Sequence, residues 1–215
     1  MEPGSRPSGR RKRTFIEEAR RAQIVSAAIR TVAEAGYANA SLARIAQHAG
    51  ISKGVISYHF SGKDELMDRV VEQIYSTIAD FVLPRVAEAP DERAALRTHI
   101  LAVADYMRSN REQLLALAGI FNGVQTPVGA PRYRMAVSEP VYRAIEERLR
   151  AGQERGVLRD FDVRVMAVSL QSAIDGMFAY WVTHPDHDLD AHAAELAELI
   201  DRSARPDSAD SAGST

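Results

Sequence analysis

A short segment of the chain, residues 51–60 (ISKGVISYHF), holds an ammonium group, an imidazole and several hydroxyl groups within a few residues. Lys53 and His59 can meet phosphate oxygens. Ser57 can hydrogen-bond to a phosphate or to a base edge, and Tyr58 can do either. Such donors on one short helix suggest contact with a nucleic acid.

The pattern around these donors predicts a short helix from residue 53 to about residue 60. Ser52 precedes it and is a favoured N-cap residue. Ile56 and Phe60 are four residues apart, so both can anchor the helix inward. Gly54, near the helix start, lets the backbone come closer to a partner than a side chain would allow. The polar side chains are then left on the outer face.

A second short helix is expected just before this one. Ser41 can cap it and Gly50 can end it. Its apolar residues recur at i, i+3, i+4 and i+7 and form one buried stripe: Leu42, Ile45, Ala46 and Ala49. Two short helices joined by a tight turn at residues 50–52 are the helix-turn-helix pattern. The alternative, from spacing alone, is an ordinary helical hairpin with a polar surface.

Charge is distributed unevenly along the chain. Residues 1–69 hold 12 Lys and Arg against 7 Asp and Glu, a balance of +5, whereas the remainder carries −7 within a net charge of −2. A basic N-terminal third on an acidic body favours contact of that third with a polyanion. The basic run 10–13 could reach a DNA minor groove, or it could serve solubility alone.

The composition is that of an ordinary globular protein, with 46% hydrophobic and 26% charged residues among 215. The absence of cysteine excludes disulfides, thiolate metal sites and cysteine nucleophiles. No apolar run approaches the ~18 residues that span a bilayer, and the segment MEPGSRPSGRRKR lacks the apolar stretch of a signal peptide. We therefore expect a cytoplasmic protein with no membrane partner.

Helical periodicity extends along the whole chain, and the sequence contains no strand pattern of any length. We expect a first helix over about 14–35, and a long helix that begins at a capping box of Ser61 and Asp64 and ends at Pro84. Further helices are expected over about 91–109, 111–121, 132–152, 162–183 and 189–202, with Asp91 and Asp162 as caps and a loop at 122–131.

The predicted fold class is therefore all-α, with an N-terminal head and a C-terminal body. The predicted divisions are a disordered basic tail (1–13), a helix-turn-helix domain (14–62), a helical body (63–202) and a second disordered tail (203–215).

The N-terminal part of the chain resembles the TetR family of bacterial transcriptional regulators. The family pattern is a first helix ending in Gly-Tyr, then a small hydroxyl residue, Ile-Ala, Ala-Gly, Ser-x-Gly, an aromatic cluster and Lys-x-x-Leu. The matching residues are Gly36-Tyr37, Ser41, Ile45-Ala46, Ala49-Gly50, Ser52-Lys53-Gly54, Tyr58-His59-Phe60 and Lys63-Asp64-Glu65-Leu66. The spacing agrees throughout residues 14–70, whereas the body matches only in helix count and in Asp175-Gly176. One departure is Ser57, where many members carry Tyr.

The resemblance implies a homodimer that binds a palindromic operator in double-stranded DNA, with no cofactor. Each third helix would enter the major groove, and a small molecule in the body would change the spacing of the two heads and release the DNA. The last two helices would pair with their copies as a four-helix bundle, and the first of them is apolar nearly all round, as a helix buried on both sides should be. The implied DNA-binding residues are Ser41, Arg44, Ser52, Lys53, Gly54, Val55, Ser57, Tyr58, His59 and Lys63.

Aromatic and polar residues of the body could line a pocket for a hydrophobic or amphipathic effector. The ligand-binding candidates are Tyr106, Phe121, Asn122, Tyr133, Tyr142, Gln171, Asp175, Phe178 and Trp181. The alternative is that these side chains are core or dimer contacts. Asp175 is the most telling, because a carboxylate within an apolar helix needs a partner, which could be a ligand cation, an arginine or a backbone N–H.

Two other kinds of site receive less support. His184, His187 and His192 could hold a metal, but their polar, proline-containing linker favours a solvated loop. No Ser/His/Asp constellation and no phosphate-binding glycine loop is present, so we expect no enzyme. We expect a ligand-responsive DNA-binding regulator, most readily a repressor. The alternative is an all-helical small-molecule-binding or scaffolding protein whose head has lost operator recognition, for which Ser57 is the only support.

Overall fold

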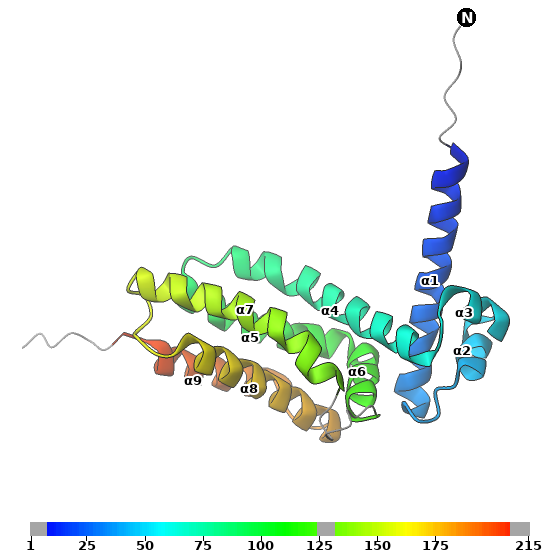
Figure 1. Cartoon of the computed structure of the whole chain (residues 1–215). Coiled ribbons are helices and arrows are strands. Elements are labelled where there is room, and N and C mark those ends of the chain that lie inside the picture. The colour runs from blue at the N-terminus through cyan, green and yellow to red at the C-terminus, as the bar shows by residue number, and fades with distance from the viewer. Residues whose placement is uncertain (1–7, 124–131, 207–215) are drawn as a thin grey trace, which may run out of the picture. The chain divides into compact units, whose positions relative to one another are not determined.

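The computed structural model describes the backbone of residues 8–123 and 132–206, and the side chains of residues 16–123 and 139–206. Within these ranges the chain forms helices and no strand (Figure 1), which confirms the predicted all-α class. The helices are α1 (Ser8–Ala35), α2 (Leu42–Ala49), α3 (Lys53–His59), α4 (Lys63–Ala87), α5 (Glu92–Ser109), α6 (Arg111–Gly123), α7 (Arg132–Glu154), α8 (Val163–Thr183) and α9 (Leu189–Ala204). Most of the two predicted tails and of the predicted loop lies outside the described residues.

Two helix ends differ most from the expected positions. α1 begins earlier, at Ser8, so that the last part of the expected basic tail is helical. The expected end of α4 at Pro84 is wrong, because the helix continues to Ala87. Proline removes one helical hydrogen bond, but Val82 and Val86 on either side of it are each only 2% exposed, and their packing holds the helix together.

Side-chain caps follow the sequence at several helix starts, and the aspartates expected to cap α5 and α8 do so. Ser52 is the N-cap residue of α3, yet its side chain makes no capping hydrogen bond. At the start of α4, Ser61 N donates to Glu65 Oε2 at 2.7 Å, so that Glu65 fills the capping role expected of Asp64.

The chain divides into two compact units. Unit 1 comprises Met1–Tyr75 and Glu112–Val128, and unit 2 comprises Ser76–Arg111 and Gly129–Thr215. Among the described residues, unit 1 holds α1, α2, α3, the first half of α4 and nearly all of α6. Unit 2 holds the rest of α4 with α5, α7, α8 and α9. α6 thus groups with the N-terminal helices although it is far from them in sequence.

Ion pairs join the helices of unit 2, in which α5 packs along α9 and α7 along α8. Arg93 on α5 donates to Asp201 on α9 through Nε and Nη2 at 2.8 to 2.9 Å. Arg164 on α8 donates to Glu146 on α7 at 2.8 Å and also pairs with Glu139 on the same helix. These arginines therefore have their acidic partners within the unit.

The expectation that no apolar run approaches the length of a membrane span is wrong for α8. A window of 18 residues in this helix has a mean hydropathy of 1.2, so by length and composition alone it could cross a membrane. Only 28% of that window is buried within the chain. Val165 and Tyr180 of α8 and Leu199 of α9 are 63%, 48% and 55% exposed. The last two helices therefore leave apolar surface uncovered.

Candidate nucleic-acid interface

α2 begins and ends as its sequence requires. Ser41 is the N-cap residue, and its Oγ accepts a hydrogen bond from Arg44 N at 3.2 Å. Gly50 ends the helix with a φ of 66°, in the left-handed region that favours glycine. There its N–H donates to Gln47 O at 3.1 Å. This cap turns the chain sharply toward α3.

α3 is anchored by the two apolar side chains that the spacing predicts. Ile56 is 0% exposed and Phe60, directly after the helix, is 2% exposed. Tyr58 is 78% exposed, and its ring meets that of His59 edge-on at a centroid distance of 5.0 Å. Anchoring on one side thus leaves an aromatic side chain with a hydroxyl group on the other.

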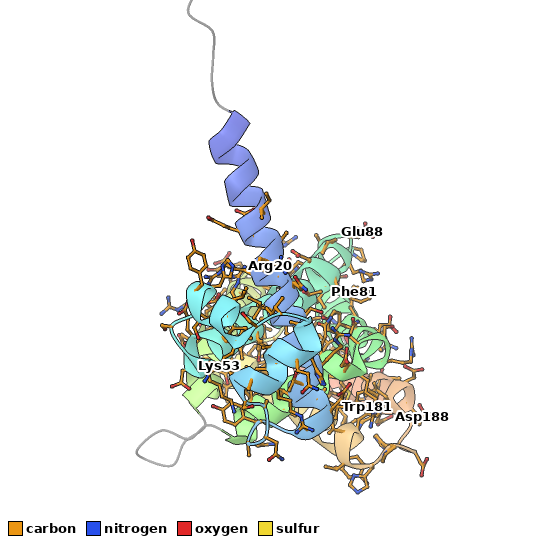
Figure 2. All side chains as sticks on the ribbon, turned by 90° about the vertical axis from the view of Figure 1, so that its right-hand side faces the viewer. Arg20, Lys53, Phe81, Glu88, Trp181 and Asp188 are labelled. Atoms are coloured by element: carbon orange, nitrogen blue, oxygen red, sulfur yellow. The ribbon has the colours of Figure 1, made fainter. Side chains whose placement is uncertain are left out.

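We name the outer surface of α2, α3 and their caps the α2–α3 face. The exposed residues among the predicted DNA contacts are Ser41, Arg44, Ser52, Lys53, Gly54, Ser57 and Tyr58. Val55 and His59 are half-buried. Residues 41–60 contain no Asp or Glu. In Figure 2 the labelled Lys53 lies on the side of unit 1 that carries these helices. The face is therefore rich in donors and free of acidic side chains, as binding to a polyanion requires.

Gly54 is not required by the packing of the protein itself. A Cβ atom added there would meet only Ser52 Oγ, at an ordinary contact distance of 3.7 Å. Glycine within a helix costs roughly 1 kcal/mol relative to alanine. A glycine that the fold does not need, on an exposed helix face, is consistent with close approach of a partner.

α1 holds the C-terminal end of α3 through Arg21. The guanidinium of Arg21 donates to His59 O, lies 4.3 Å from the centre of the Phe60 ring and pairs with Glu65 on α4 at 3.4 Å. The pKa of Glu65 is lowered first by the hydrogen bonds from Ser61 and then by Arg21. Sequence reasoning missed Arg21, because nothing in local periodicity links it to residues that follow it by some forty positions.

α1 also holds α2 from behind. Gln23 Nε2 donates to Ala49 O at 2.8 Å in the last turn of α2, and Arg20 Nη1 donates to Gln23 Oε1 at 2.7 Å. Thr31, which is fully buried, lies with its Oγ1 2.9 Å from His48 Nδ1. α1 therefore fixes the orientation of both short helices while their outer face stays open.

Lys63 differs from the other predicted contacts because it is turned toward the protein. Its Nζ donates to Tyr37 O at 2.5 Å and lies 3.9 Å from the centre of the Tyr37 ring. Burial lowers the pKa of Lys63, and the charge of Asp64 opposes this effect. Lys63 thus joins the start of α4 to the turn that follows α1.

The same turn is met by α6, within unit 1. A Cβ atom at Gly123 would lie 2.3 Å from Tyr37 Cδ1, and one at Gly119 would lie 3.2 Å from Val32 Cγ1. Only glycine permits so close an approach at the end of α6. α6 therefore packs directly on the residues that precede the α2–α3 face.

The predicted ligand-binding residues are divided between the two units. Phe121 and Asn122 lie on α6 in unit 1, and the side chain of Tyr133 lies outside the described ones. The remaining candidates, all in unit 2, are Tyr106, Tyr142, Gln171, Asp175, Phe178 and Trp181.

Two of these aromatic residues make core contacts. Tyr106 is 2% exposed, and its ring meets Phe81 edge-on at 5.6 Å. Burial raises the pKa of Tyr106 to about 12, while a hydrogen bond with Thr77 acts in the opposite direction. Trp181 is buried with the guanidinium of Arg111 4.5 Å from its ring centre. These contacts favour the alternative interpretation, in which the aromatics are part of the core.

The other candidates in unit 2 are half-buried. Gln171 Nε2 donates a hydrogen bond to Asp175 Oδ1 at 2.9 Å. The Asp175 carboxylate, which was expected to need a partner, therefore has one within α8. The guanidinium of Arg164 lies 5.0 Å from the ring of Tyr142. A cavity in unit 2 is lined by none of the predicted ligand-binding residues.

The histidines between α8 and α9 contact one another and a tyrosine. His187 Nε2 lies 2.8 Å from His192 Nδ1, and the His184 ring stacks on Tyr180 at 4.0 Å. No group of three metal-ligating side chains occurs among the described residues.

The chain is similar to known proteins over the region that forms the α2–α3 face and beyond it. Residues 24–70 match the family model of bacterial regulatory proteins of the tetR family. The HTH-type transcriptional regulator BetI 2 of Chromohalobacter salexigens is 30% identical over 191 residues, which cover 83% of this chain and 84% of the relative. The chain belongs to the TetR family.

Other matches agree with this membership. The TetR-family regulator BetI 1 of Chromohalobacter salexigens is 38% identical over 90 residues, covering 42% of this chain and 43% of that protein. The fold is similar to that of the fatty acid degradation regulator FadR of Bacillus halodurans, with a TM-score of 0.74 and 20% identity over 84% of this chain and 93% of that one. It is also similar to NalD of Pseudomonas aeruginosa, with a TM-score of 0.69 and 21% identity over 88% and 98%.

As a TetR-family protein the chain is a DNA-binding transcriptional regulator, and the expected resemblance is confirmed. The part that matches the family model runs from the middle of α1 into α4 and includes the whole α2–α3 face. Arg20, Arg21 and Gln23, which hold that face from behind, precede the matched residues.

Proposed function

We propose that this TetR-family regulator is a homodimeric, cytoplasmic repressor that binds a palindromic operator through the α2–α3 face and leaves it when a small molecule binds in unit 2. The observation that carries the proposal is the exposed, acid-free α2–α3 face held from behind by α1. Its nitrogen and hydroxyl donors suit the phosphates and base edges of a DNA major groove.

Each part of the face has its own expected contact. Ser41 and Arg44, at the start of α2, are suited to phosphate contacts because they are exposed beside a helix N-terminus. Residues 53–57, in the first turns of α3, follow the N-cap residue Ser52 and would enter the major groove. Tyr58 and His59 would contact the sugar–phosphate backbone on the other side. Lys63, which donates to Tyr37, would position α4 and add at most a secondary phosphate contact.

The dimer is supported by the uncovered apolar surface of α8 and α9. Val165, Tyr180 and Leu199 are exposed in the single chain, and a second copy packed against these helices would remove them from water. A closed two-fold dimer presents two identical α2–α3 faces, and such symmetry matches a palindromic operator.

A role in repression is supported by the descriptions of two proteins of similar fold. NalD is described as the secondary repressor of the MexAB-OprM multidrug efflux pump, and FadR as a regulator of fatty acid degradation. The relative that matches most of the chain is described as a transcriptional regulator, which supports a regulator rather than an enzyme. A hydrophobic or amphipathic effector agrees with the aliphatic walls of the cavity in unit 2.

The test is binding of the full chain to labelled DNA from upstream of its own gene, measured by fluorescence anisotropy against random DNA at several salt concentrations. We expect preference for the upstream DNA, two subunits or a multiple per site, and a steep decrease of affinity with salt. Lys53→Ala should cost about 1–3 kcal/mol of binding free energy if Lys53 contacts a base, and less if it contacts only phosphate.

The matched control is Arg30→Ala, which removes an exposed arginine of α1 that is not part of the α2–α3 face. Equal losses of DNA-binding free energy for Lys53→Ala and Arg30→Ala would mean that DNA affinity depends only on the overall charge of the protein. Equal, weak binding to both DNAs, followed by a genome-wide pull-down without a preferred site, would support the alternative of a ligand-binding or scaffolding protein.

A further inference from the structure

A cavity of about 40 Å³ lies within unit 2, between side chains of α4, α5, α7 and α8. Aliphatic side chains form most of its wall, and the two polar residues that line it are His99 of α5 and Arg148 of α7. Both are partly buried. The cavity therefore combines apolar walls with two nitrogen-bearing groups that come from different helices.

Arg148 differs from the other arginines that join helices of unit 2. Arg93 and Arg164 have carboxylate partners at 2.8 and 2.5 Å, whereas Arg148 has no ion pair or hydrogen bond with any described side chain. His99 likewise has no hydrogen-bond partner among the described residues. The guanidinium of Arg148 is partly buried at the cavity, and no carboxylate among the described residues neutralises its charge. An anion that enters the cavity can therefore pair with it.

The site carries a single positive charge near pH 7. Burial lowers the pKa of His99 to about 4, and the positive charge of Arg148 acts in the same direction. His99 is therefore neutral near pH 7 and offers one N–H donor, while Arg148 carries the single positive charge. One guanidinium and one neutral imidazole suit a monoanion, whereas a phosphate dianion would leave a negative charge uncompensated in an apolar surrounding.

We propose that this cavity binds the carboxylate of a small monocarboxylic acid, with Arg148 and His99 donating to its oxygens and its short hydrocarbon chain lying against the aliphatic walls. Guanidinium groups match carboxylates in shape as well as charge. The cavity has room for little more than the carboxylate group itself, so α4, α5 and α7 must separate to admit the hydrocarbon chain of butyrate or hexanoate. The role of such an acid as effector rests on the repressor function proposed above, but its binding does not.

The experiment is isothermal titration calorimetry of the full chain at constant ionic strength and pH 7.5. The probes are butyrate and hexanoate, with butanol, hexanol, hexylammonium and inorganic phosphate as comparisons. We expect the two carboxylates to bind at one site per chain, and the alcohols, the amine and phosphate to bind at least tenfold more weakly, because they lack the single negative charge or carry too much of it.

Arg148→Gln should weaken carboxylate binding about tenfold to a hundredfold, as expected for loss of a hydrogen bond to a charged group. Arg148→Lys, which keeps the charge but not the planar fork, should retain part of the affinity. Arg143→Gln is the control, since it removes a well exposed arginine of the same helix and should leave carboxylate binding unchanged. The melting temperature of unliganded Arg148→Gln should not fall, because the substitution removes an unpaired charge, and this separates loss of the site from loss of the fold.

The proposal is wrong if the alcohols or the amine bind as tightly as the acids, if no probe binds, or if Arg148→Gln binds hexanoate like the wild-type chain. Operator binding without any acid is measured in parallel. Hexanoate binding without release of DNA would leave the site intact and overturn its role as effector site. Failure to bind DNA at all would overturn the proposed function and leave the calorimetric test of the site unaffected.

Discussion

The α2–α3 face and the cavity of unit 2 both present nitrogen donors, but they are built in opposite ways. The donors of the face come from one contiguous stretch, residues 41–60, and are exposed while α1 holds their helices from behind. The donors of the cavity come from α5 and α7, some fifty residues apart, and lie among aliphatic side chains.

This difference determines how each region responds to substitution. A change on the exposed face removes or adds contacts with a partner and leaves the packing nearly unchanged, because few protein atoms touch it. A change in the cavity or at a helix contact alters the stability of the unit itself. Substitutions in the two regions should therefore differ in whether they change stability or DNA binding.

The largest effect is expected from protonation of His99. Its pKa is lowered to about 4, chiefly by burial, whereas an unfolded histidine titrates near its ordinary value of 6.5. Between these values the unfolded chain binds a proton that the folded chain does not, so the free energy of unfolding falls as the pH falls through this window, by at most about 3 kcal/mol.

The measurement is urea unfolding of the wild type and of His99→Gln between pH 7.5 and pH 4, followed by circular dichroism. The difference between the two chains should shrink as the pH falls, because the variant has no group to protonate at this place. His184→Gln removes an exposed histidine and serves as control. Parallel curves for wild type and His99→Gln would contradict the assignment of a buried neutral imidazole.

A smaller but clear loss of stability is expected from Gly123→Ala. The new Cβ would lie 2.3 Å from Tyr37 Cδ1 and 2.8 Å from Tyr37 Cβ. Relief of this clash therefore requires movement of the Tyr37 Cβ atom and not only of its ring. Overpacking of this kind costs about 1–3 kcal/mol. Gly119→Ala, whose Cβ would meet only Val32 Cγ1 at 3.2 Å, should cost less. Thermal unfolding of both variants checks the order, and an equal loss in the two would show that the close contact with Tyr37 is not the cause.

Gly54→Ala should separate stability from DNA binding. The added methyl group meets only Ser52 Oγ at 3.7 Å. Because alanine has a higher helix propensity than glycine, the free energy of unfolding should rise by up to about 1 kcal/mol. On DNA the same methyl group should obstruct the groove and weaken operator binding at least about tenfold, or roughly 1.4 kcal/mol. Anisotropy and thermal unfolding on one preparation give both values. Unchanged operator affinity would remove Gly54 from the interface.

The smallest effects are expected from the two serine caps of the α2–α3 face. Ser41 Oγ accepts from Arg44 N, so Ser41→Ala should cost about 1 kcal/mol of stability. Ser52 makes no capping hydrogen bond, so Ser52→Ala should cost only a few tenths of a kcal/mol. Chemical unfolding resolves such a difference, and a reversed order would mean that Ser52 caps α3 in solution.

The helix-turn-helix region agrees with its sequence because its signals are local. The stripe of Ile45, Ala46 and Ala49 is buried, Gly50 adopts the left-handed conformation, and Ile56 anchors α3. Each of these features depends on neighbours within one or two helical turns. The same is true of the aspartate caps of α5 and α8.

Predictions that depend on distant contacts could not be made from local patterns, and one of them is wrong. Pro84 does not end α4, because apolar packing on both sides of it outweighs the lost hydrogen bond. Tyr106 and Trp181 stay predicted pocket residues, and the structure shows both buried, in contact with Phe81 and Arg111. Aromatic side chains at helical spacing serve a core and a pocket equally well, and periodicity alone does not distinguish the two.

The all-α class and the short paired helices could be predicted from the sequence, because helix periodicity, caps and turn glycines act over a few residues. Contacts between distant segments could not be predicted in this way. Arg21 reaches His59, Gly123 admits Tyr37, and Arg148 shares a cavity with His99. These pairs come from segments far apart in sequence, and their proximity is set by how whole helices pack.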